Sequence, residues 1–236
     1  MLAGRTALVT GASRGVGAAI ARALGNAGAR VGVASRTRPA LDQLAAEIGN
    51  GAFAVECDLA DPSSAGNAVA AVRSTLGGAP DILVNNAGLF VIRAIDETSL
   101  EELQSLLATN VTGAFALTRS FLAEMKARGS GHVVTIGSIA DRHIFPGNAA
   151  YSATKYASRA IHEVLRAETR GSGIRATLVS PAAVDTNIWD PIQYYGSDDR
   201  PDRSAMLQPE AVAEAVIFAV SRTAAVNIDE LRLSRT

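Results

Sequence analysis

Short apolar runs rich in valine, isoleucine and leucine alternate along this chain with longer alanine-rich stretches whose apolar residues recur at helical spacing. Such short runs are typical of the strands of a parallel sheet that helices cover on both faces. Seven strands are predicted, at residues 6–10, 30–35, 53–57, 82–85, 132–136, 175–179 and 228–233. With about six helices between them, they predict a three-layer α/β fold with one doubly wound sheet. The even rhythm indicates a single domain over residues 1–236.

Capping residues mark the starts of three predicted helices. Asp61 precedes Pro62, and Ser99 stands three residues before Glu102, which is the spacing of a capping box. Pro209 likewise occupies the first turn of the last predicted helix. These residues agree with the apolar periodicity about where the helices begin.

Charge and composition exclude several classes of function. The 22 basic and 23 acidic residues give a net charge of −1, so no overall field attracts nucleic acid or an anionic membrane. Cys57 is the only cysteine, which excludes an intrachain disulfide, and His132, His143 and His162 lack the spacing of a metal site. No protein-held metal is therefore expected. The N-terminal residues lack the layout of a signal peptide and no apolar stretch approaches 18 residues, so a cytoplasmic location is expected.

A turn with three glycines follows the first predicted strand and runs directly into a helical segment. Glycine allows tight curvature and close approach of a ligand, and a helix N-terminus offers free N–H groups to a pyrophosphate. The spacing lacks the Lys-Ser/Thr pair of nucleoside triphosphate loops, which favours a dinucleotide over ATP; an ordinary structural turn is the alternative. The residues assigned to the cofactor here are Gly11, Ser13, Arg14, Gly15, Val16 and Gly17.

The end of the second predicted strand indicates which dinucleotide is bound. An Asp or Glu at this place would bind the adenosine ribose of NAD, but the chain has Ser35 and Arg36. Together with Arg14, they supply a hydroxyl and two guanidinium groups for a 2′-phosphate. We therefore expect NADP(H) to be preferred over NAD(H). The alternative is that Arg36 simply points to solvent.

Tyr151 and Lys155 form the most specific chemical signal in the chain. Lysine is rare here, with two lysines against twenty arginines, yet Lys155 follows Tyr151 by four residues. At helical spacing these side chains share one face, which places a phenol beside an ammonium. A free phenol has a pKa of about 10, and a nearby cation stabilises the phenolate and lowers that pKa. The pair is therefore expected to act as a general acid and base.

Several further motifs stand along the chain. Together, and in this order, the motifs resemble those of the short-chain dehydrogenase/reductase family. The nearest relatives in kind are the 3-oxoacyl-acyl-carrier-protein reductases and similar carbonyl reductases. The resemblance covers nearly the whole chain and implies a Rossmann-type fold that binds a dinucleotide. The motifs that carry it are residues 10–17, 58–59, 85–88, 110–113, 138, 151–155 and 180–186.

The resemblance also implies roles for individual residues. Asp58 would contact the adenine amino group, and Thr186 would meet the nicotinamide carboxamide. Lys155 would reach the nicotinamide ribose hydroxyls, as well as acting on Tyr151. Further cofactor contacts are implied for Leu59, Asn86, Ala87, Gly88, Tyr151 and Pro181.

Two more residues complete the implied catalytic set with Tyr151 and Lys155. Ser138 would hydrogen-bond the substrate oxygen as charge develops on it. The backbone of Asn110, which falls in an apolar helix, would hold a water that links Lys155 to solvent.

A substrate pocket is expected at the carboxyl ends of the fifth and sixth strands. Its residues would be 139–145, Asn148, Ala182, Ala183 and 188–195, with Ile92 or Val91 near its mouth. Apolar and aromatic members of this set favour an apolar carbonyl compound. The polar stretch at residues 194–204 is interpreted as a surface loop or as part of a lid at residues 187–207. Ala182 departs from the family's usual glycine, and its methyl group would narrow the nicotinamide pocket or shift the loop.

The predicted function is an NADP(H)-dependent oxidoreductase that interconverts a ketone or aldehyde and an alcohol. A catalytically silent dinucleotide-binding regulatory protein is the alternative, because fold alone does not establish activity. An epimerase or dehydratase is disfavoured, since no second catalytic acid is evident. The expected partners are a small carbonyl or alcohol substrate and, from the resemblance, further copies of the chain in a dimer or tetramer. Such copies would meet through residues 100–127 and 149–170. Ile161, Val164 and Leu165 are candidates for the outer face, and core packing is the alternative for them.

Overall fold

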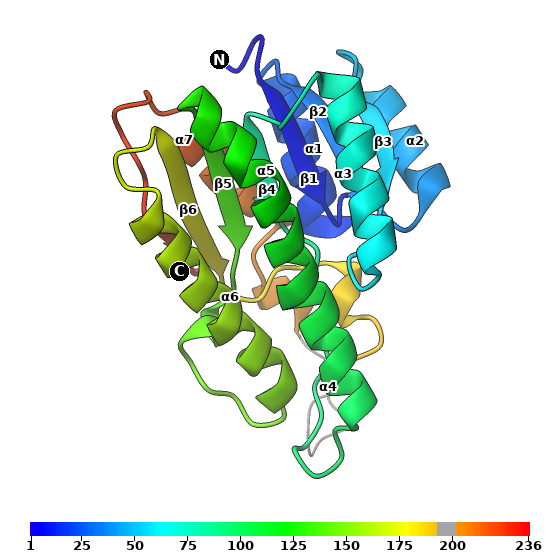
Figure 1. Cartoon of the computed structure of the whole chain (residues 1–236). Helices are drawn as coiled ribbons and strands as arrows, with labels where there is room; N and C mark the ends of the chain where they lie inside the picture. Colours follow the sequence, from blue (N-terminus) through cyan, green and yellow to red (C-terminus); the bar gives the residue numbers. More distant parts are fainter. Residues whose placement is uncertain (193–201) are drawn as a thin grey trace.

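One parallel sheet of seven strands forms the centre of the molecule (Figure 1). The structure, a computed structural model, describes residues 1–192 and 202–236. The strand order is β3-β2-β1-β4-β5-β6-β7 and all neighbouring pairs are parallel. The predicted α/β fold is therefore confirmed. The strands are β1 (Thr6–Thr10), β2 (Arg30–Ser35), β3 (Phe53–Glu56), β4 (Ile82–Asn85), β5 (Gly131–Ile136), β6 (Ile174–Pro181) and β7 (Glu230–Leu233).

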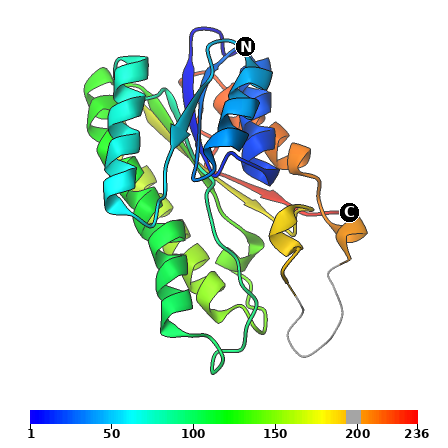
Figure 2. The same ribbon diagram turned by 90° about the vertical axis from the view of Figure 1, so that its right-hand side faces the viewer.

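Helices cover both faces of this sheet (Figure 2). On one face, α1 (Gly15–Asn26), α2 (Arg38–Ile48) and α7 (Pro209–Val220) bury alanine, leucine and valine against β1, β2 and β4. The other face holds α3 (Pro62–Leu76), α4 (Leu100–Leu107), α5 (Ala114–Arg128) and α6 (Ala149–Glu168). Short 3-10 turns follow, η2 (Ile139–Asp141), η3 (Asn187–Trp189) and η4 (Arg203–Ala205). No helix within residues 1–192 and 202–236 is long and apolar enough to cross a membrane.

The predicted helix starts at residues 62, 100 and 209 are confirmed. Asp61 accepts a hydrogen bond from the backbone N–H of Ser63 at 2.8 Å, and Ser99 and Glu102 form a reciprocal capping box. Pro209 lies in the first turn of α7. Each cap satisfies backbone donors that a helix start would otherwise leave without partners.

Some predicted boundaries change for reasons visible in the sheet. β6 extends to Pro181 because residues 178–181 pair with β7, and β7 starts only at Glu230, which pairs with Leu178. The predicted helix at residues 100–127 divides into α4, a π-helical turn η1 (Ala108–Gly113) and α5. Of the residues considered for an outer face or for the core, Leu165 packs in the core, whereas Val164 is 55% exposed.

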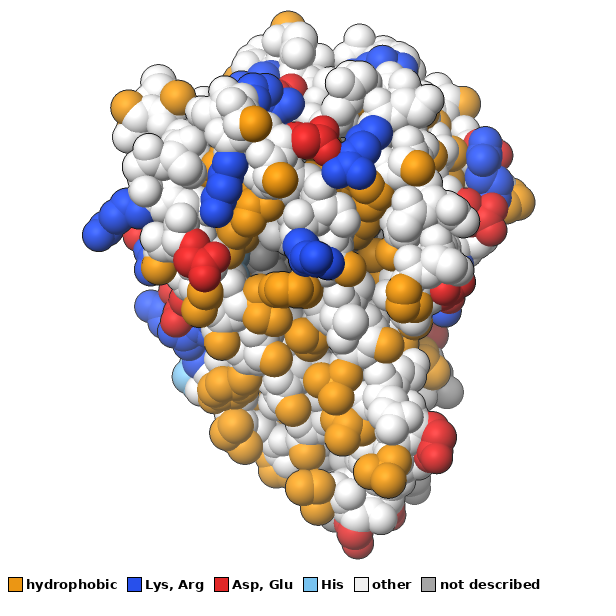
Figure 3. Space-filling model, viewed as in Figure 1, with side chains coloured by type: hydrophobic (Ala, Val, Ile, Leu, Met, Phe, Trp, Pro, Cys, Tyr) orange, Lys and Arg blue, Asp and Glu red, His pale blue; other side chains and the backbone are white. Residues whose placement is uncertain are grey.

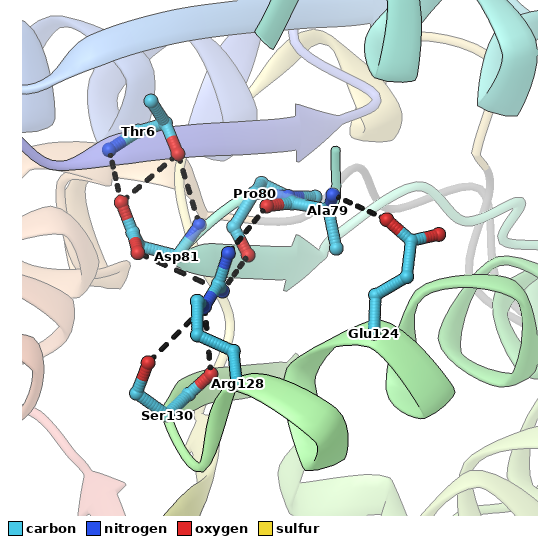
Figure 4. Close-up of polar contacts among 7 residues, drawn as sticks. All are labelled: Thr6, Ala79, Pro80, Asp81, Glu124, Arg128 and Ser130. Carbon is cyan, nitrogen blue, oxygen red and sulfur yellow. Dashed lines mark hydrogen bonds and ion pairs between the residues drawn. The ribbon is translucent and has the colours of Figure 1, made fainter. Parts of the chain in front are cut away.

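A polar cluster joins β1 to β4 at the amino ends of the strands (Figure 4). The Asp81 carboxylate accepts hydrogen bonds from the backbone N–H of Thr6 at 2.8 Å and from its hydroxyl at 3.0 Å. Arg128, at the end of α5, donates to the carbonyl oxygens of Ala79 and Pro80 and lies 3.6 Å from Asp81. These contacts hold the segment before β4 against both its strand neighbour and its covering helix.

The chain reverses its direction of winding between β1 and β4. From β1, the strands run outward to β3 on one side and to β7 on the other. The connections that leave β1 and β4 therefore turn to opposite faces, which opens a crevice at the carboxyl ends of these strands. This is the place where the fold can hold a ligand.

Candidate active site

A cavity of about 930 Å³ lies at the carboxyl ends of the strands. Its walls come from the segments that follow β1 through β6 and from the start of α6. Three of the four predicted catalytic residues line it, namely Ser138, Tyr151 and Lys155. The predicted cofactor residues that line it are Gly11, Ser13, Arg14, Gly15, Val16, Gly17, Ser35, Arg36, Asp58, Leu59, Asn86, Ala87, Gly88, Pro181 and Thr186.

The glycine turn between β1 and α1 has the geometry of a phosphate-binding turn. Gly11 and Gly15 have φ of +64° and +55°, a region that side chains rarely adopt. A Cβ on Gly17 would lie 2.3 Å from the Gly11 carbonyl oxygen, so only glycine allows this close packing. Arg14, the residue before α1, makes no side-chain cap, which leaves the first N–H groups of the helix for a ligand. The cradle therefore fits a pyrophosphate.

One end of the cavity is the place where the sequence predicts that the adenosine of the cofactor binds. This adenosine end lies at the ends of β2 and β3. The Ser35 hydroxyl accepts a hydrogen bond from the Thr37 backbone at 3.2 Å, and Arg36 is exposed. Asp58 accepts a hydrogen bond from the Ala60 backbone at 3.0 Å. Burial raises the pKa of the Cys57 thiol from 9.0 to about 11, so this lining residue stays protonated and uncharged. In the described part of this region, the positive charges come from Arg14 and Arg36.

Asn86 and Thr10 join the two loops that border the crevice. The Asn86 amide donates to the Thr10 carbonyl oxygen at 2.8 Å. The Thr10 hydroxyl in turn accepts from the backbone N–H groups of Asn86 and Ala87 at 3.0 and 3.1 Å. Because these bonds cross from the end of β1 to the end of β4, they hold together the two loops that form the floor of the cavity.

Tyr151 and Lys155 lie one helical turn apart on α6. The Lys155 ammonium is 5.6 Å from the centre of the Tyr151 ring, and the residue is only 7% exposed. Within residues 1–192 and 202–236, this ammonium donates one hydrogen bond, to the Ile136 carbonyl oxygen at 3.0 Å. An ammonium has three donors, so two are available to a ligand. The pairing expected from the sequence spacing is present.

Ser138 follows β5 and faces the same cavity. Its hydroxyl accepts a hydrogen bond from the Ala140 backbone at 3.1 Å. The turn that carries it is tied to the next strand by Asp141, a fully buried residue whose carboxylate accepts a 2.5 Å hydrogen bond from the Ser180 hydroxyl. Arg142 binds the other oxygen of Asp141 at 2.7 Å and also pairs with Glu230 on β7. The ends of three strands are thereby linked beside Ser138.

Asn110 lies behind the cavity wall and is not among the described residues that line it. It sits in the π-helical turn η1, where its amide binds both the N–H and the C=O of Leu89, at 2.7 and 2.9 Å. The same amide donates to Thr154, whose hydroxyl donates to the Tyr151 carbonyl oxygen at 2.7 Å. The Asn110 carbonyl oxygen accepts from Ser158 at 3.1 Å. The visible role of Asn110 is therefore to join the loop after β4 to α6.

The segment after β6 closes the cavity against the glycine turn. A Cβ on Gly15 would lie 3.1 Å from a methyl carbon of Thr186, so these two segments nearly touch. The backbone of Ala182 donates to the Leu233 carbonyl oxygen at 2.8 Å. Arg203 binds Asp185 at 2.5 Å and Asp190 at 2.7 Å. Residues 193–201 of the predicted lid at 187–207 lie outside the described residues.

The predicted substrate pocket is only partly correct. Ile139, Ala140, Phe145, Asn148, Ala182, Ala183, Ile188 and Trp189 line the cavity, and so does Ile92. The described residues 141–144, 190–192 and Val91 do not line it. The chain turns Asp141 into the core and leaves Ile144 on the surface. Tyr194 and Tyr195 lie outside the described residues. Phe90 also lines the cavity. It was not predicted from the sequence, although it stands two residues after Gly88.

Within residues 1–192 and 202–236, no three His, Cys, Asp or Glu side chains form a cluster that could hold a metal ion. His132 and His162 are buried, and their imidazoles bond Thr177 and Thr135 at 2.8 and 2.9 Å. They belong to the core, away from the cavity lining.

The family can be assigned from the sequence as a whole. A sequence profile described as short chain dehydrogenase matches residues 5–194. The chain belongs to this family. This short-chain dehydrogenase combines the parallel sheet with the glycine turn and the Tyr151 and Lys155 pair.

Individual relatives support this assignment. An uncharacterised oxidoreductase of Staphylococcus haemolyticus is 34% identical over 98% of this chain and 96% of its own length. The glycine betaine reductase of Emericella nidulans is 36% identical over 98% of this chain, which spans 18% of that longer protein. A metagenomic short-chain oxidoreductase in complex with NADP is 30% identical over 100% of this chain and 98% of its own, with a TM-score of 0.85.

Proposed function

We propose that this short-chain dehydrogenase is an NADP(H)-dependent oxidoreductase that interconverts a ketone or aldehyde and an alcohol. The observation that carries the proposal is the common cavity. Tyr151, Ser138 and the buried Lys155 ammonium line the same space as the glycine turn, so an acid, an oxygen-binding hydroxyl and a dinucleotide cradle meet. One domain, residues 1–236, would supply both functions.

NADP(H) is proposed because of the charges at the adenosine end. Arg36 follows Ser35 at the end of β2, and both residues line the cavity, as does Arg14 of the glycine turn. Guanidinium groups bind phosphate oxygens through charge-assisted hydrogen bonds. No carboxylate stands at the end of β2 to bind the ribose of NAD, since β2 ends at Ser35 and Arg36 follows. An NADP complex of a similar oxidoreductase is consistent with this assignment.

The chemistry follows from the residues around the reacting carbonyl. When bound, the reduced nicotinamide would supply a hydride to the carbonyl carbon. The Tyr151 phenol donates a proton to the carbonyl oxygen, and the Ser138 hydroxyl donates a hydrogen bond to the same oxygen as its charge grows. The Lys155 ammonium stabilises the phenolate left on Tyr151, and its two remaining donors would bind the ribose hydroxyls of the cofactor. Alcohol oxidation runs through the same groups in reverse.

Replacement of Tyr151 by phenylalanine tests the mechanism. The variant keeps the ring and loses the proton, so kcat for ketone reduction should fall by about 10²- to 10⁴-fold, the usual contribution of a general acid. NADPH affinity should stay within about threefold, because the main cofactor contacts are elsewhere. NADPH absorbance with a panel of ketones, aldehydes and acyl thioesters gives the rates, and fluorescence titration gives the affinity.

Tyr156 offers a matched control. It lies one turn further along α6, is 40% exposed and does not line the cavity, so Tyr156→Phe should keep the wild-type rate. Full activity in Tyr151→Phe would contradict the mechanism. Tight NADPH binding by a wild-type protein that reduces nothing in the panel would instead favour a silent regulatory protein.

Self-association is proposed from the face that Figure 3 shows, where apolar side chains gather over the α4, α5 and α6 region. Leu100, Phe115 and Val164 are 71%, 50% and 55% exposed. Exposed apolar clusters of this kind mark protein contacts. We propose a homodimer or homotetramer through this face, which sedimentation analysis checks.

A further inference from the structure

Phe90 lies between two aromatic side chains inside the cavity. Its ring centre is 4.6 Å from that of Tyr151 and 5.0 Å from that of Trp189, and both pairs are edge-to-face with an interplanar angle of 72°. The three residues come from the loop after β4, from α6 and from η3. Phe90 therefore forms a wall that touches the catalytic phenol on one side and the segment after β6 on the other.

Neighbouring bonds hold this wall in place. The Asn110 amide binds both backbone groups of Leu89, the residue before Phe90. On the far side, the indole N–H of Trp189 donates to the Val184 carbonyl oxygen at 2.9 Å. Because the backbone before Phe90 and the Trp189 side chain are both held by hydrogen bonds, the Phe90 ring has little freedom to move away from a ligand.

The surroundings of Phe90 are uncharged. Among the described residues that line the cavity, the charged ones are Arg14, Arg36, Asp58 and Lys155. The first three belong to the glycine turn and to the ends of β2 and β3, and Lys155 points its ammonium at Ile136. The loops after β4, β5 and β6 also contribute large apolar lining residues, namely Leu89, Ile92, Ile139, Phe145, Pro146, Ile188 and Trp189. Beside the Phe90 and Trp189 rings, a substrate carboxylate would lose its water without gaining a cationic partner from the described lining residues of these loops.

Resting on the oxidoreductase function proposed above, we infer that Phe90 is a specificity-determining residue. It selects uncharged ketones or aldehydes whose apolar substituent packs against the Phe90 and Trp189 rings. Since the carbonyl oxygen must reach Tyr151 and Ser138, the Phe90 ring beside Tyr151 limits the size of that substituent. Phenyl methyl ketone represents a substituent that fits, and naphthyl methyl ketone represents one that the ring obstructs.

Two substitutions of Phe90 test the size limit. Phe90→Ala removes the wall, so the ratio of kcat/KM for naphthyl over phenyl methyl ketone should rise about tenfold or more, mainly through a lower KM for the larger ketone. Phe90→Leu keeps an apolar wall of smaller size and should raise the ratio by about threefold. Phe218→Ala is the matched control, because Phe218 is a 46% exposed residue of α7 that does not line the cavity.

Charge is tested with a phenyl-substituted α-keto acid of similar size. The wild-type enzyme should use it at least about tenfold less efficiently than phenyl methyl ketone, because the carboxylate has no partner near Phe90. A preference for the keto acid would overturn the assigned substrate class. An unchanged ketone ratio in Phe90→Ala, with wild-type NADPH affinity and melting temperature, would overturn the role of Phe90.

Trp189 provides a readout that does not depend on turnover. It is the only tryptophan in the chain, so its fluorescence reports on this wall alone. Phenyl methyl ketone should quench the Trp189 fluorescence in the wild-type protein. Phe90→Ala should lower the Kd of naphthyl methyl ketone by about tenfold. If the ketones bind in this way but are not reduced, the proposed function fails and the pocket assignment stands. If they are reduced and Phe90→Ala changes neither Kd nor the kcat/KM ratio, the function stands and this inference fails.

Discussion

At the position of Lys155, the shape of the side chain matters as well as its charge. The chain uses arginine twenty times and lysine twice, yet a lysine occupies the buried position beside Tyr151. Its compact ammonium binds the Ile136 carbonyl oxygen and still lies 5.6 Å from the Tyr151 ring. A planar guanidinium is larger and directs its donors in a fixed fork, so it could not occupy the same space in the same way.

Arg36 is the residue on which cofactor preference should depend. Arg36→Asp removes a cation from the adenosine end and adds a carboxylate that can bind ribose hydroxyls. The Kd for NADPH should rise by about 10- to 100-fold, the value of one charge-assisted phosphate contact, while the Kd for NADH should fall or stay unchanged. Fluorescence titration with both cofactors measures the change.

Arg38 is the control for that experiment. It is exposed, pairs with Asp42 at 2.8 Å and does not line the cavity, so Arg38→Ala should leave the ratio of the two affinities unaltered. Equal NADPH affinity in Arg36→Asp and the wild type would show that Arg36 points to solvent.

At the scale of elements, the polar cluster that joins β1 to β4 lies at the opposite end of the sheet from the proposed active site. The Asp81 and Thr6 bonds lie at the amino ends of these strands, whereas the cavity lies at their carboxyl ends. Parallel sheets therefore allow the two ends to be altered separately.

Asp81→Ala should lower the free energy of unfolding by about 2–3 kcal/mol, because it leaves the Thr6 donors without an acceptor and removes the anion beside Arg128. The kcat/KM for ketone reduction should stay at the wild-type value at temperatures where the variant is folded. Urea unfolding and NADPH-linked rates measure the two quantities. Asp42→Ala, which breaks an exposed pair, should cost less than about 0.5 kcal/mol. Equal losses of unfolding free energy in the two variants would contradict a stabilising role of the polar cluster.

Elements with strong local signals could be predicted from the sequence. β4 has the predicted bounds because a strand buried on both faces is a continuous apolar run, and the glycine turn was evident from its spacing. The π-helical turn could not be predicted, because it depends on the contacts of Asn110 with Leu89 and Thr154. Phe90 was missed for a similar reason. Its position matters only because the fold brings Tyr151 and Trp189 to it.

At the scale of the whole molecule, two buried histidines make stability depend on pH. Burial lowers the pKa of His132 from 6.5 to about 3 and that of His162 from 6.5 to about 4. Neither imidazole meets a carboxylate in the described hydrogen bonds, which are to Thr177 and Thr135. Both rings are therefore neutral in the folded protein at pH 7, and an unfolded chain binds protons more readily as the solution becomes acidic.

The folded state should lose stability as the pH falls below 6.5, the ordinary histidine value. Between pH 7 and pH 5 each imidazole should cost about 2 kcal/mol, since the unfolded state gains a proton that the folded state does not bind. His162→Gln should roughly halve the combined loss, measured as the difference in urea unfolding free energy between the two pH values. His143→Gln, at an exposed position, should leave that difference as in the wild type. A His162→Gln variant with the full wild-type loss would contradict this origin of the pH dependence.

The strand order has a consequence for how the chain can fold while the ribosome is still making it. β2 pairs with β1, β3 with β2, and β5, β6 and β7 each pair with the strand synthesised just before them. Only β4 must find an earlier partner, because it returns to β1 after β2 and β3 are complete. Each new strand can therefore be added to an existing sheet edge as it emerges, and the return of β4 to β1 is the one slow, long-range step. A nascent chain that stops before β4 would expose the free edge of β1 to aggregation, and one that has passed it would not.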